Sequence, residues 1–183
     1  MFFTIQTLYM LKSYSLGGMI GGTSSAGVVK ELAPIIAAFA LSGRIGASIT
    51  AELGAMKVTE QIDAMRVMGT DPVKYLVVPR FIACTFMLPV LTVFAIFLGI
   101  VGACITVVFI FDMNATFFLQ KVKESLFIND LFITMFKTLV FGMIIATVGC
   151  YRGFSTPQTS GAEGVGRATT GTVVESVIVI LIF

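Results

Sequence analysis

Hydrophobic and polar residues alternate along this chain in long blocks, which is typical of helices that cross a membrane. The clearest block is residues 81–111, thirty-one positions without a charged side chain. About 20 apolar residues are enough for one spanning helix. Pro89, Gly99 and Gly102 lie inside the block, so the pattern predicts one kinked or tilted helix rather than two spans.

A second span is predicted over residues 32–51. The uncharged stretch 32–43 is too short to cross alone, but continuing the helix through Arg44 to Ala51 reaches twenty residues. Arg44 then lies either at membrane depth with a partner or near the interface, where its side chain snorkels, and we favour the interface.

Small residues recur at helical spacing along this second span and beyond it. Such a face lets helices approach closely in lipid, where packing drives association. The pairs are Ser42/Gly43, Gly46/Ala47, Thr50/Ala51 and Gly54/Ala55. We therefore predict that Gly43, Gly46, Ala47 and Gly54 are helix-packing residues.

The remaining apolar blocks predict a third span at about residues 131–151 and a fourth that begins near Thr172. Residues 1–11 are apolar but too few to cross, and the last block is still apolar at Phe183. We therefore expect the chain to start inside one helix and finish inside another. Between the charge-free block 81–111 and the third span, residues 112–130 are mildly amphipathic, with Phe118, Val122 and Leu126 spaced four residues apart.

Basic residues suggest an orientation in the membrane. Arg44 to Arg80 holds five Lys and Arg, and residues 152–171 hold two. The opposite side holds five: Lys12, Lys30, Lys121, Lys123 and Lys137. Seven against five favours residues 56–80 and 152–171 on the cytoplasmic side.

A short amphipathic helix is predicted inside the connection at residues 55–80. Thr59 can cap it, Glu60 and Asp63 suit its positive end, and Gly69 followed by Asp71-Pro72 stops it.

One side of this short helix is apolar, because Ile62, Met65 and Met68 recur at three-residue spacing. Two interpretations stand: the helix lies flat in the lipid headgroups, or it docks into a groove on a cytoplasmic partner, where methionine adapts well.

Composition agrees with a membrane location. Of 183 residues, 57% are hydrophobic and 12% are charged, against roughly a quarter charged in soluble domains. The net charge of +2 is too small to suggest nucleic acid. The chain has no histidine, which excludes Ser–His and Cys–His catalysis and imidazole metal sites. We expect no catalytic residue, no metal site and no cofactor, and we interpret Cys84, Cys104 and Cys150 as buried small hydrophobes.

Two further features have a plain and a functional interpretation. The string GAEGVGRAT at residues 161–169 resembles a phosphate-binding loop, but Arg167 and Ala168 replace the Lys and the hydroxyl residue. No strand precedes it, so we interpret its glycines as a flexible, close-packing loop. Lys30, Glu31 and Lys137 either anchor their helices at the interface or line a polar cavity between helices.

Residues 30–80 carry a specific resemblance. The series ELAP, GRIG, AELGAMKVTEQIDA, MGTDP and PR is similar to the MlaE permease family, and the similarity continues through residues 88–103, 137–153 and 161–176. These proteins are membrane subunits of ABC transporters that work with MCE-domain proteins on lipids.

The resemblance implies an all-α, polytopic transmembrane bundle of five spans, here with the first and last incomplete, in one permease domain over residues 1–183. It implies that the segment matching Thr59 to Gly69 is a cytoplasmic coupling helix that receives motion from a separate ATPase. The predicted ATPase-coupling residues are Thr59, Glu60, Ile62, Asp63, Met65, Arg66, Met68 and Gly69.

The resemblance further implies that Lys30, Glu31 and Lys137 line a lipid cavity. The expected partners are an ABC ATPase, an MCE-domain subunit, a second copy of the permease and membrane lipid. The expected location is a bacterial inner membrane or an organelle membrane of bacterial descent. The alternatives are an ion-coupled secondary carrier, which would need paired midplane charges in a repeated fold, a non-transporting scaffold and, more remotely, an intramembrane hydrolase.

Overall fold

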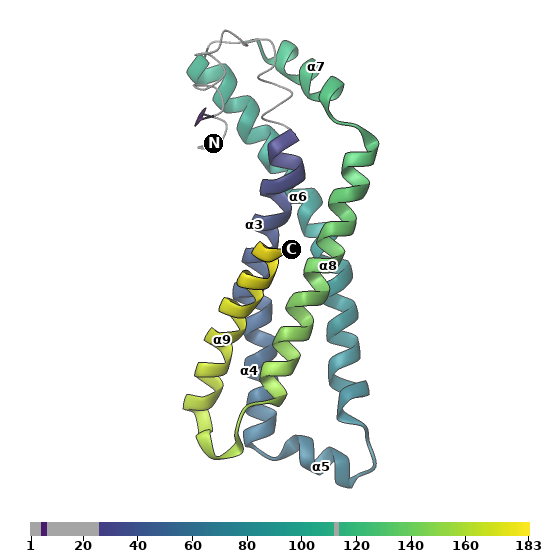
Figure 1. Ribbon diagram of the computed structural model, residues 1–183, viewed down its shortest axis with the longest axis vertical. Coiled ribbons are helices and arrows are strands. Elements are labelled where there is room, and N and C mark those ends of the chain that lie inside the picture. Colours follow the sequence, from purple (N-terminus) through teal and green to yellow (C-terminus); the bar gives the residue numbers. More distant parts are fainter. Residues whose placement is uncertain (1–4, 7–25, 112–113) are drawn as a thin grey trace. The chain divides into compact units, whose positions relative to one another are not determined.

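The chain folds into α-helices joined by short connections (Figure 1). The structure is a computed structural model, and it describes residues 5–6, 26–111 and 114–183. No strand occurs among these residues, which confirms the predicted all-α class. The elements are η2 (Val28–Leu32), α3 (Ala33–Leu41), η3 (Ser42–Gly46), α4 (Ala47–Val58), α5 (Gln61–Val67), η4 (Val73–Val77), α6 (Val78–Phe111), α7 (Ala115–Ser125), α8 (Ile128–Phe154), η5 (Gln158–Ser160) and α9 (Gly161–Ile182).

Four helices in the described ranges are long and apolar enough to cross a membrane. They cover Val28–Val58, Val73–Phe109, Ile128–Phe154 and Gln158–Ile182. This confirms a polytopic helical bundle, and it confirms that the second predicted span continues through Arg44. The apolar residues 1–11 lie outside the described residues except for positions 5 and 6.

The glycine-rich string differs from the prediction. It forms the first turns of α9, which begins at Gly161 rather than near Thr172. Packing against α4 offsets the poor helix propensity of glycine. At Gly54 of α4 an added Cβ would lie 3.4 Å from a methyl group of Val165, and the buried Thr172 hydroxyl lies 2.8 Å from that of Thr50.

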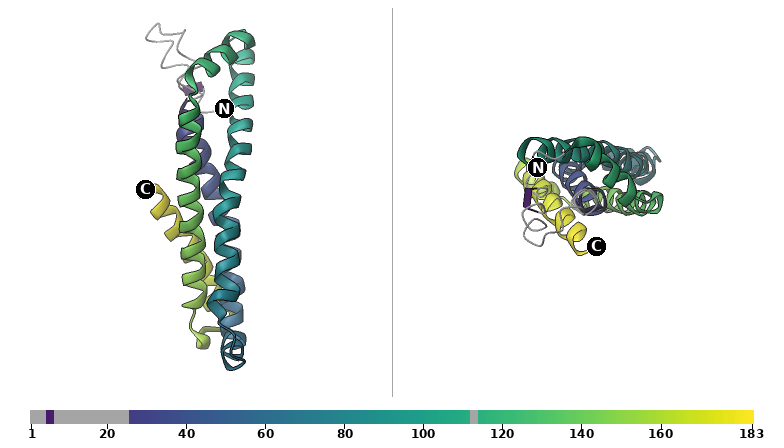
Figure 2. Two further views of the ribbon diagram at one scale, coloured as in Figure 1. Left: turned by 90° about the vertical axis from the view of Figure 1, so that its right-hand side faces the viewer. Right: turned by 90° about the horizontal axis from the view of Figure 1, so that it is seen from above.

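Two compact units make up the chain. The first comprises Met1–Ile36 and Val90–Lys137. In it α7 lies across the end of α6 (Figure 2), where Phe118 and Val122 pack against Ala103 and Val107. The Asn114 side chain accepts a hydrogen bond from the Thr116 amide and caps α7. The predicted amphipathic character of this connection is confirmed.

The second unit comprises Ala37–Pro89 and Thr138–Phe183. Its core contains Leu53, Ile62, Cys84 and Cys150 at one level and Leu41, Leu88, Phe141 and Ile145 at another. The α4–α5–α6 and α8–α9 connections lie together at one end of this unit (Figure 1). A hydrogen bond of 2.7 Å from Gln158 to Asp63 joins them, so the two connections grouped by the charge count share one side.

Three glycines of α8 let backbones approach closely within the second unit. A Cβ atom added at Gly142 would lie 2.8 Å from the Cys84 carbonyl oxygen of α6. At Gly149 it would lie 3.3 Å from the Gly46 carbonyl oxygen, and at Gly153 it would lie 2.6 Å from the Leu53 Cβ. The helix therefore lies against α6, η3 and α4 with no more than a Cβ atom between the backbones.

Candidate functional site

The short helix α5 is the central element of the predicted coupling site, and it begins later than predicted. Thr59 ends α4 instead of capping α5: its hydroxyl donates to the Ala55 carbonyl at 2.9 Å. Glu60 follows with φ of 60° and turns the chain sharply, so that α5 starts at Gln61. The Thr59 hydroxyl is thus used by the preceding helix, and a tight left-handed turn replaces the expected side-chain cap.

The apolar side of α5 packs largely on its own chain. Ile62 is 0% exposed, and Met65 packs beside it against the same core cluster. Met68, by contrast, is 73% exposed, and Val67 is 89% exposed. The three residues grouped by spacing therefore have different environments. The apolar surface open to a partner is formed by Val67 and Met68, and Val67 was missed because it falls outside the three-residue repeat.

Asp63 fastens α5 to two other segments. Lys57 of α4 approaches its carboxylate at 3.3 Å, and Gln158 of η5 donates to it at 2.7 Å. Arg66, one turn further along α5, completes the group at 3.5 Å. The buried Ile62 and this polar cluster hold α5 in a defined orientation at the end of the second unit, while Gly69, with φ of 76°, turns the chain away.

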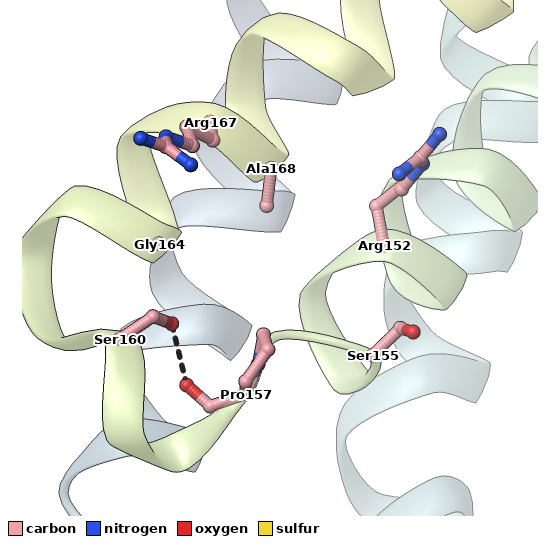
Figure 3. Close-up of a pocket in the computed structure, with 7 residues that line it drawn as sticks. All are labelled: Arg152, Ser155, Pro157, Ser160, Gly164, Arg167 and Ala168. Carbon is pink, nitrogen blue, oxygen red and sulfur yellow. Dashed lines mark hydrogen bonds between the residues drawn. The ribbon is translucent and has the colours of Figure 1, made fainter.

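A pocket of about 250 Å³ lies beside this end, between α8 and α9 (Figure 3). Two arginines line it, but each already has a carboxylate partner. Arg152 donates from Nε to Glu175 at 2.7 Å, and Arg167 pairs with Glu163 at 2.6 Å. Ser160 donates to the Pro157 carbonyl, the dashed line in Figure 3. With its cations neutralised and its hydroxyl engaged, this pocket does not form a strong anion site.

The predicted cavity charges lie in the first unit and form two ion pairs. Lys137 Nζ lies 2.9 Å from Glu31, and Lys30 Nζ lies 2.9 Å from Asp130. The pairs link the start of the first described span to the start of α8. Asp130 was missed, because nothing in the sequence indicates that it meets Lys30 a hundred positions away. Its position immediately before an apolar block was the available signal.

The predicted helix-packing residues have different surroundings. A Cβ added at Gly46 would lie 3.2 Å from Ile145, and one at Gly54 would lie 3.3 Å from Thr156. Ala47 is half-buried. Gly43 is exposed, and an added Cβ would meet nothing within 4 Å in the described part of the chain.

These features define a class: an integral membrane protein of several spans, with a short amphipathic helix fastened between two of them. Among the described residues, no group of three or more metal-binding side chains lies together.

Comparison with known proteins identifies the family. The family model "Permease MlaE" matches residues 1–183. A probable ABC transporter permease of Synechocystis sp. is 44% identical over 182 residues, which cover 100% of this chain and 68% of the relative. A probable ABC transporter permease of Rickettsia typhi is 42% identical over 155 residues, covering 85% of this chain and 59% of the relative. The Arabidopsis thaliana protein TRIGALACTOSYLDIACYLGLYCEROL 1, chloroplastic, is 36% identical over 182 residues, covering 100% of this chain and 51% of the relative.

The chain belongs to the MlaE permease family. It spans between about half and two thirds of the length of these three relatives.

Proposed function

We propose that this chain is the permease subunit of an ABC transporter that moves lipid between membranes, with phospholipid as the expected substrate, and that ATP is hydrolysed on a separate subunit. The observation that carries the proposal is the arrangement of α5. Ile62 and Asp63 tie the helix to its own chain, while Val67 and Met68 remain open to a partner. A helix held in this way can pass motion from a docked ATPase into α4 and η5.

A lipid substrate is supported by two observations. The name of the Arabidopsis relative refers to trigalactosyldiacylglycerol, which is a lipid. The ion pairs Lys30–Asp130 and Lys137–Glu31 place charged groups within or beside apolar helices. Intramembrane charges tend to face the bundle interior. There, an anionic lipid headgroup could replace the carboxylate that pairs with Lys30 or Lys137 and bind to the lysine.

The proposed assembly contains an ABC ATPase, an MCE-domain subunit and a second copy of the permease, in which residues 1–183 act as one permease domain. The ATPase would dock on α5 at the cytoplasmic side. Relatives named as bacterial permeases and a chloroplastic relative support a bacterial inner membrane or an organelle membrane of bacterial descent.

The test is purification of the full-length protein with its neighbours, followed by mass spectrometry of the copurifying proteins and lipids. The expected result is an ABC ATPase in fixed stoichiometry, together with phospholipid or another diacyl lipid. Purified complex in vesicles should then move lipid only when ATP is supplied. Lipid movement driven by an ion gradient without ATP would favour a secondary carrier instead. Absence of any ATPase and of any lipid movement would favour a scaffold.

A further inference from the structure

A second cavity, of about 320 Å³, lies in the second unit on the surface shared by η3, α4 and the start of α6. Its polar lining consists of Arg44, Ser48, Glu52 and Arg80, and its apolar lining consists of Ile45, Ile49, Ala83 and Cys84. None of the polar residues belongs to α5 or to the ion pairs of the first unit. The cavity is thus separate from the coupling helix and from the charged pairs already described.

The polar residues form a continuous stripe. Arg44, Ser48 and Glu52 follow one another at four-residue spacing and therefore share one face of their helix. Ser48 donates to Glu52 at 3.3 Å, and Glu52 accepts from Arg80 at 2.8 Å. Counted from Val58, Arg44 lies about 21 Å along the helix axis at 1.5 Å per residue. The stripe therefore runs from the middle of α4 into η3. Arg44 lies near the middle of the apolar helix Val28–Val58, so we place it at membrane depth, which is the alternative that the sequence left beside the interface.

The charges in this cavity do not balance. Two guanidinium groups face one carboxylate, and Glu52 is engaged by Arg80. Among the described residues no carboxylate pairs with Arg44, which is exposed. The Nη1 atom of Arg80 is buried without a hydrogen-bond acceptor in the same part of the chain. The cavity thus has an excess positive charge and unused donors.

An excess cation in the middle of a membrane span requires an anion. An unpaired guanidinium costs several kcal/mol at membrane depth, and basic pockets between transmembrane helices bind anionic lipid headgroups. A guanidinium presents donors in a fork that matches a phosphate group. The apolar lining beside the arginines suits the glycerol and the first methylenes of an acyl chain.

We propose that this cavity binds the phosphate group of an anionic phospholipid, with Arg44 as its principal ligand and Arg80 as a second donor. Glu52 orients Arg80 and limits the affinity, so that the lipid is held but can leave. The role of the site in lipid movement rests on the proposed function, whereas the binding itself does not.

The test uses the purified full-length complex and native mass spectrometry. Dioctanoylphosphatidylglycerol is titrated against the complex, with dioctanoylglycerol and inorganic phosphate in parallel titrations. Arg44→Gln removes the unpaired guanidinium and should weaken phosphatidylglycerol binding roughly tenfold, as expected for loss of a charge-assisted hydrogen bond. Glu52→Gln removes the competing carboxylate and should strengthen the same binding. Arg167→Gln, an exposed arginine outside the cavity, is the matched control and should bind as the unaltered protein does.

Opposite effects at Arg44 and Glu52 would support an anion site, because a merely structural role would weaken binding in both variants. Wild-type binding by Arg44→Gln would overturn the proposal, as would equal binding of dioctanoylglycerol. Equal affinity for inorganic phosphate and phosphatidylglycerol would assign the site to free phosphate instead of lipid. A loss of dimer in Arg44→Gln, with lipid binding unchanged, would identify a carboxylate of a second copy as the occupant.

If the complex binds phosphatidylglycerol in this pattern but moves no lipid with ATP, the site stands and the proposed transport function fails. If lipid transport persists but the complex does not bind phosphatidylglycerol in this pattern, the proposed transport function stands and the proposed site fails.

Discussion

Thr50 of α4 and Thr172 of α9 meet in the interior of the second unit, with their hydroxyl oxygens 2.8 Å apart. Both side chains are fully buried. The Thr50 hydroxyl also lies 3.0 Å from the Gly149 carbonyl oxygen of α8. One threonine thus joins three helices by polar contacts in an apolar surrounding.

We predict that Thr50→Val destabilises the protein, because valine keeps the shape and removes the hydrogen bonds. Interhelical hydrogen bonds in membrane proteins contribute about 0.6 kcal/mol on average and up to about 1.7. The expected loss is therefore about 1 kcal/mol, measured as a lower unfolding temperature in detergent. Thr50→Ser keeps the hydroxyl and should lose less. Equal unfolding temperatures for the valine variant and the unaltered protein would contradict this role.

Gly142→Ala should destabilise the contact between α8 and α6. The added methyl group would lie 2.8 Å from a backbone oxygen, which cannot move aside as a side chain could, and overpacking of this kind costs about 1–3 kcal/mol. Gly102→Ala in α6 is the matched control, because an added Cβ meets nothing within 4 Å among the described residues. It should be neutral or slightly stabilising, and an equal effect of both changes on thermal unfolding would count against the close approach.

The sequence predicted the spans well where the physics is local. The charge-free block 81–111 became α6, and Phe118 and Val122 on one face of the 112–130 connection became buried in α7. The beginning of α9 was not predictable in this way. Glycine disfavours helices by about 1 kcal/mol per residue, and only packing against α4 reveals why glycines are tolerated there.

The candidate sites depended on contacts between distant parts of the chain, which the sequence does not display. Spacing grouped Ile62, Met65 and Met68 but could not tell that the core of the same chain covers Ile62. Lys30 and Lys137 were identifiable as charges beside apolar blocks, whereas their pairing with Asp130 and Glu31 required the folded structure.

Changing Val67 and Met68 together to Asp should abolish copurification of the ATPase. Both side chains are exposed on α5, and docking would bury two charges without partners. The permease should still insert in the membrane, because neither residue contributes to the core. Phe117→Asp with Leu119→Asp, exposed residues on α7, serves as the control and should retain the ATPase. Wild-type stoichiometry in the α5 variant would remove the basis for the coupling role.

Lys137→Gln should reduce the amount of lipid that copurifies, if Lys137 lines the lipid cavity as proposed. The substitution keeps a polar side chain, one atom shorter than that of lysine, and removes the charge that faces Glu31. Because partly exposed ion pairs contribute about 0–1 kcal/mol, unfolding should change little. Lys123→Gln on the exposed face of α7 is the control. Quantitative mass spectrometry measures the lipid that copurifies with each variant and with the unaltered protein. An unchanged lipid content in Lys137→Gln would exclude Lys137 from the cavity.

Residues 56–80 should face the cytoplasm, in accordance with their basic residues and the docking proposed for α5. Thr70 is exposed just beyond α5, so a cysteine there should be accessible. In right-side-out vesicles, a membrane-impermeant maleimide should label Thr70→Cys only after permeabilisation. Cys84 and Cys150 are buried as predicted, whereas Cys104 is half-buried, so the protein without the substitution is labelled in parallel to give the background. Labelling in intact vesicles would reverse the topology.

The glycines of α8 bear on how a displacement would travel through the second unit. Gly142 and Gly149 lie closest to main-chain oxygens of their neighbours, and Gly153 lies closest to the Leu53 Cβ. None of these atoms moves in a rotamer change, so side-chain rotation cannot absorb a displacement there. If the end of the second unit that carries α5 is displaced, α8 should therefore move as a rigid body together with α4 and α6. The close packing of α8 therefore predicts that a displacement at one of these three glycines moves the helix at the other two as well.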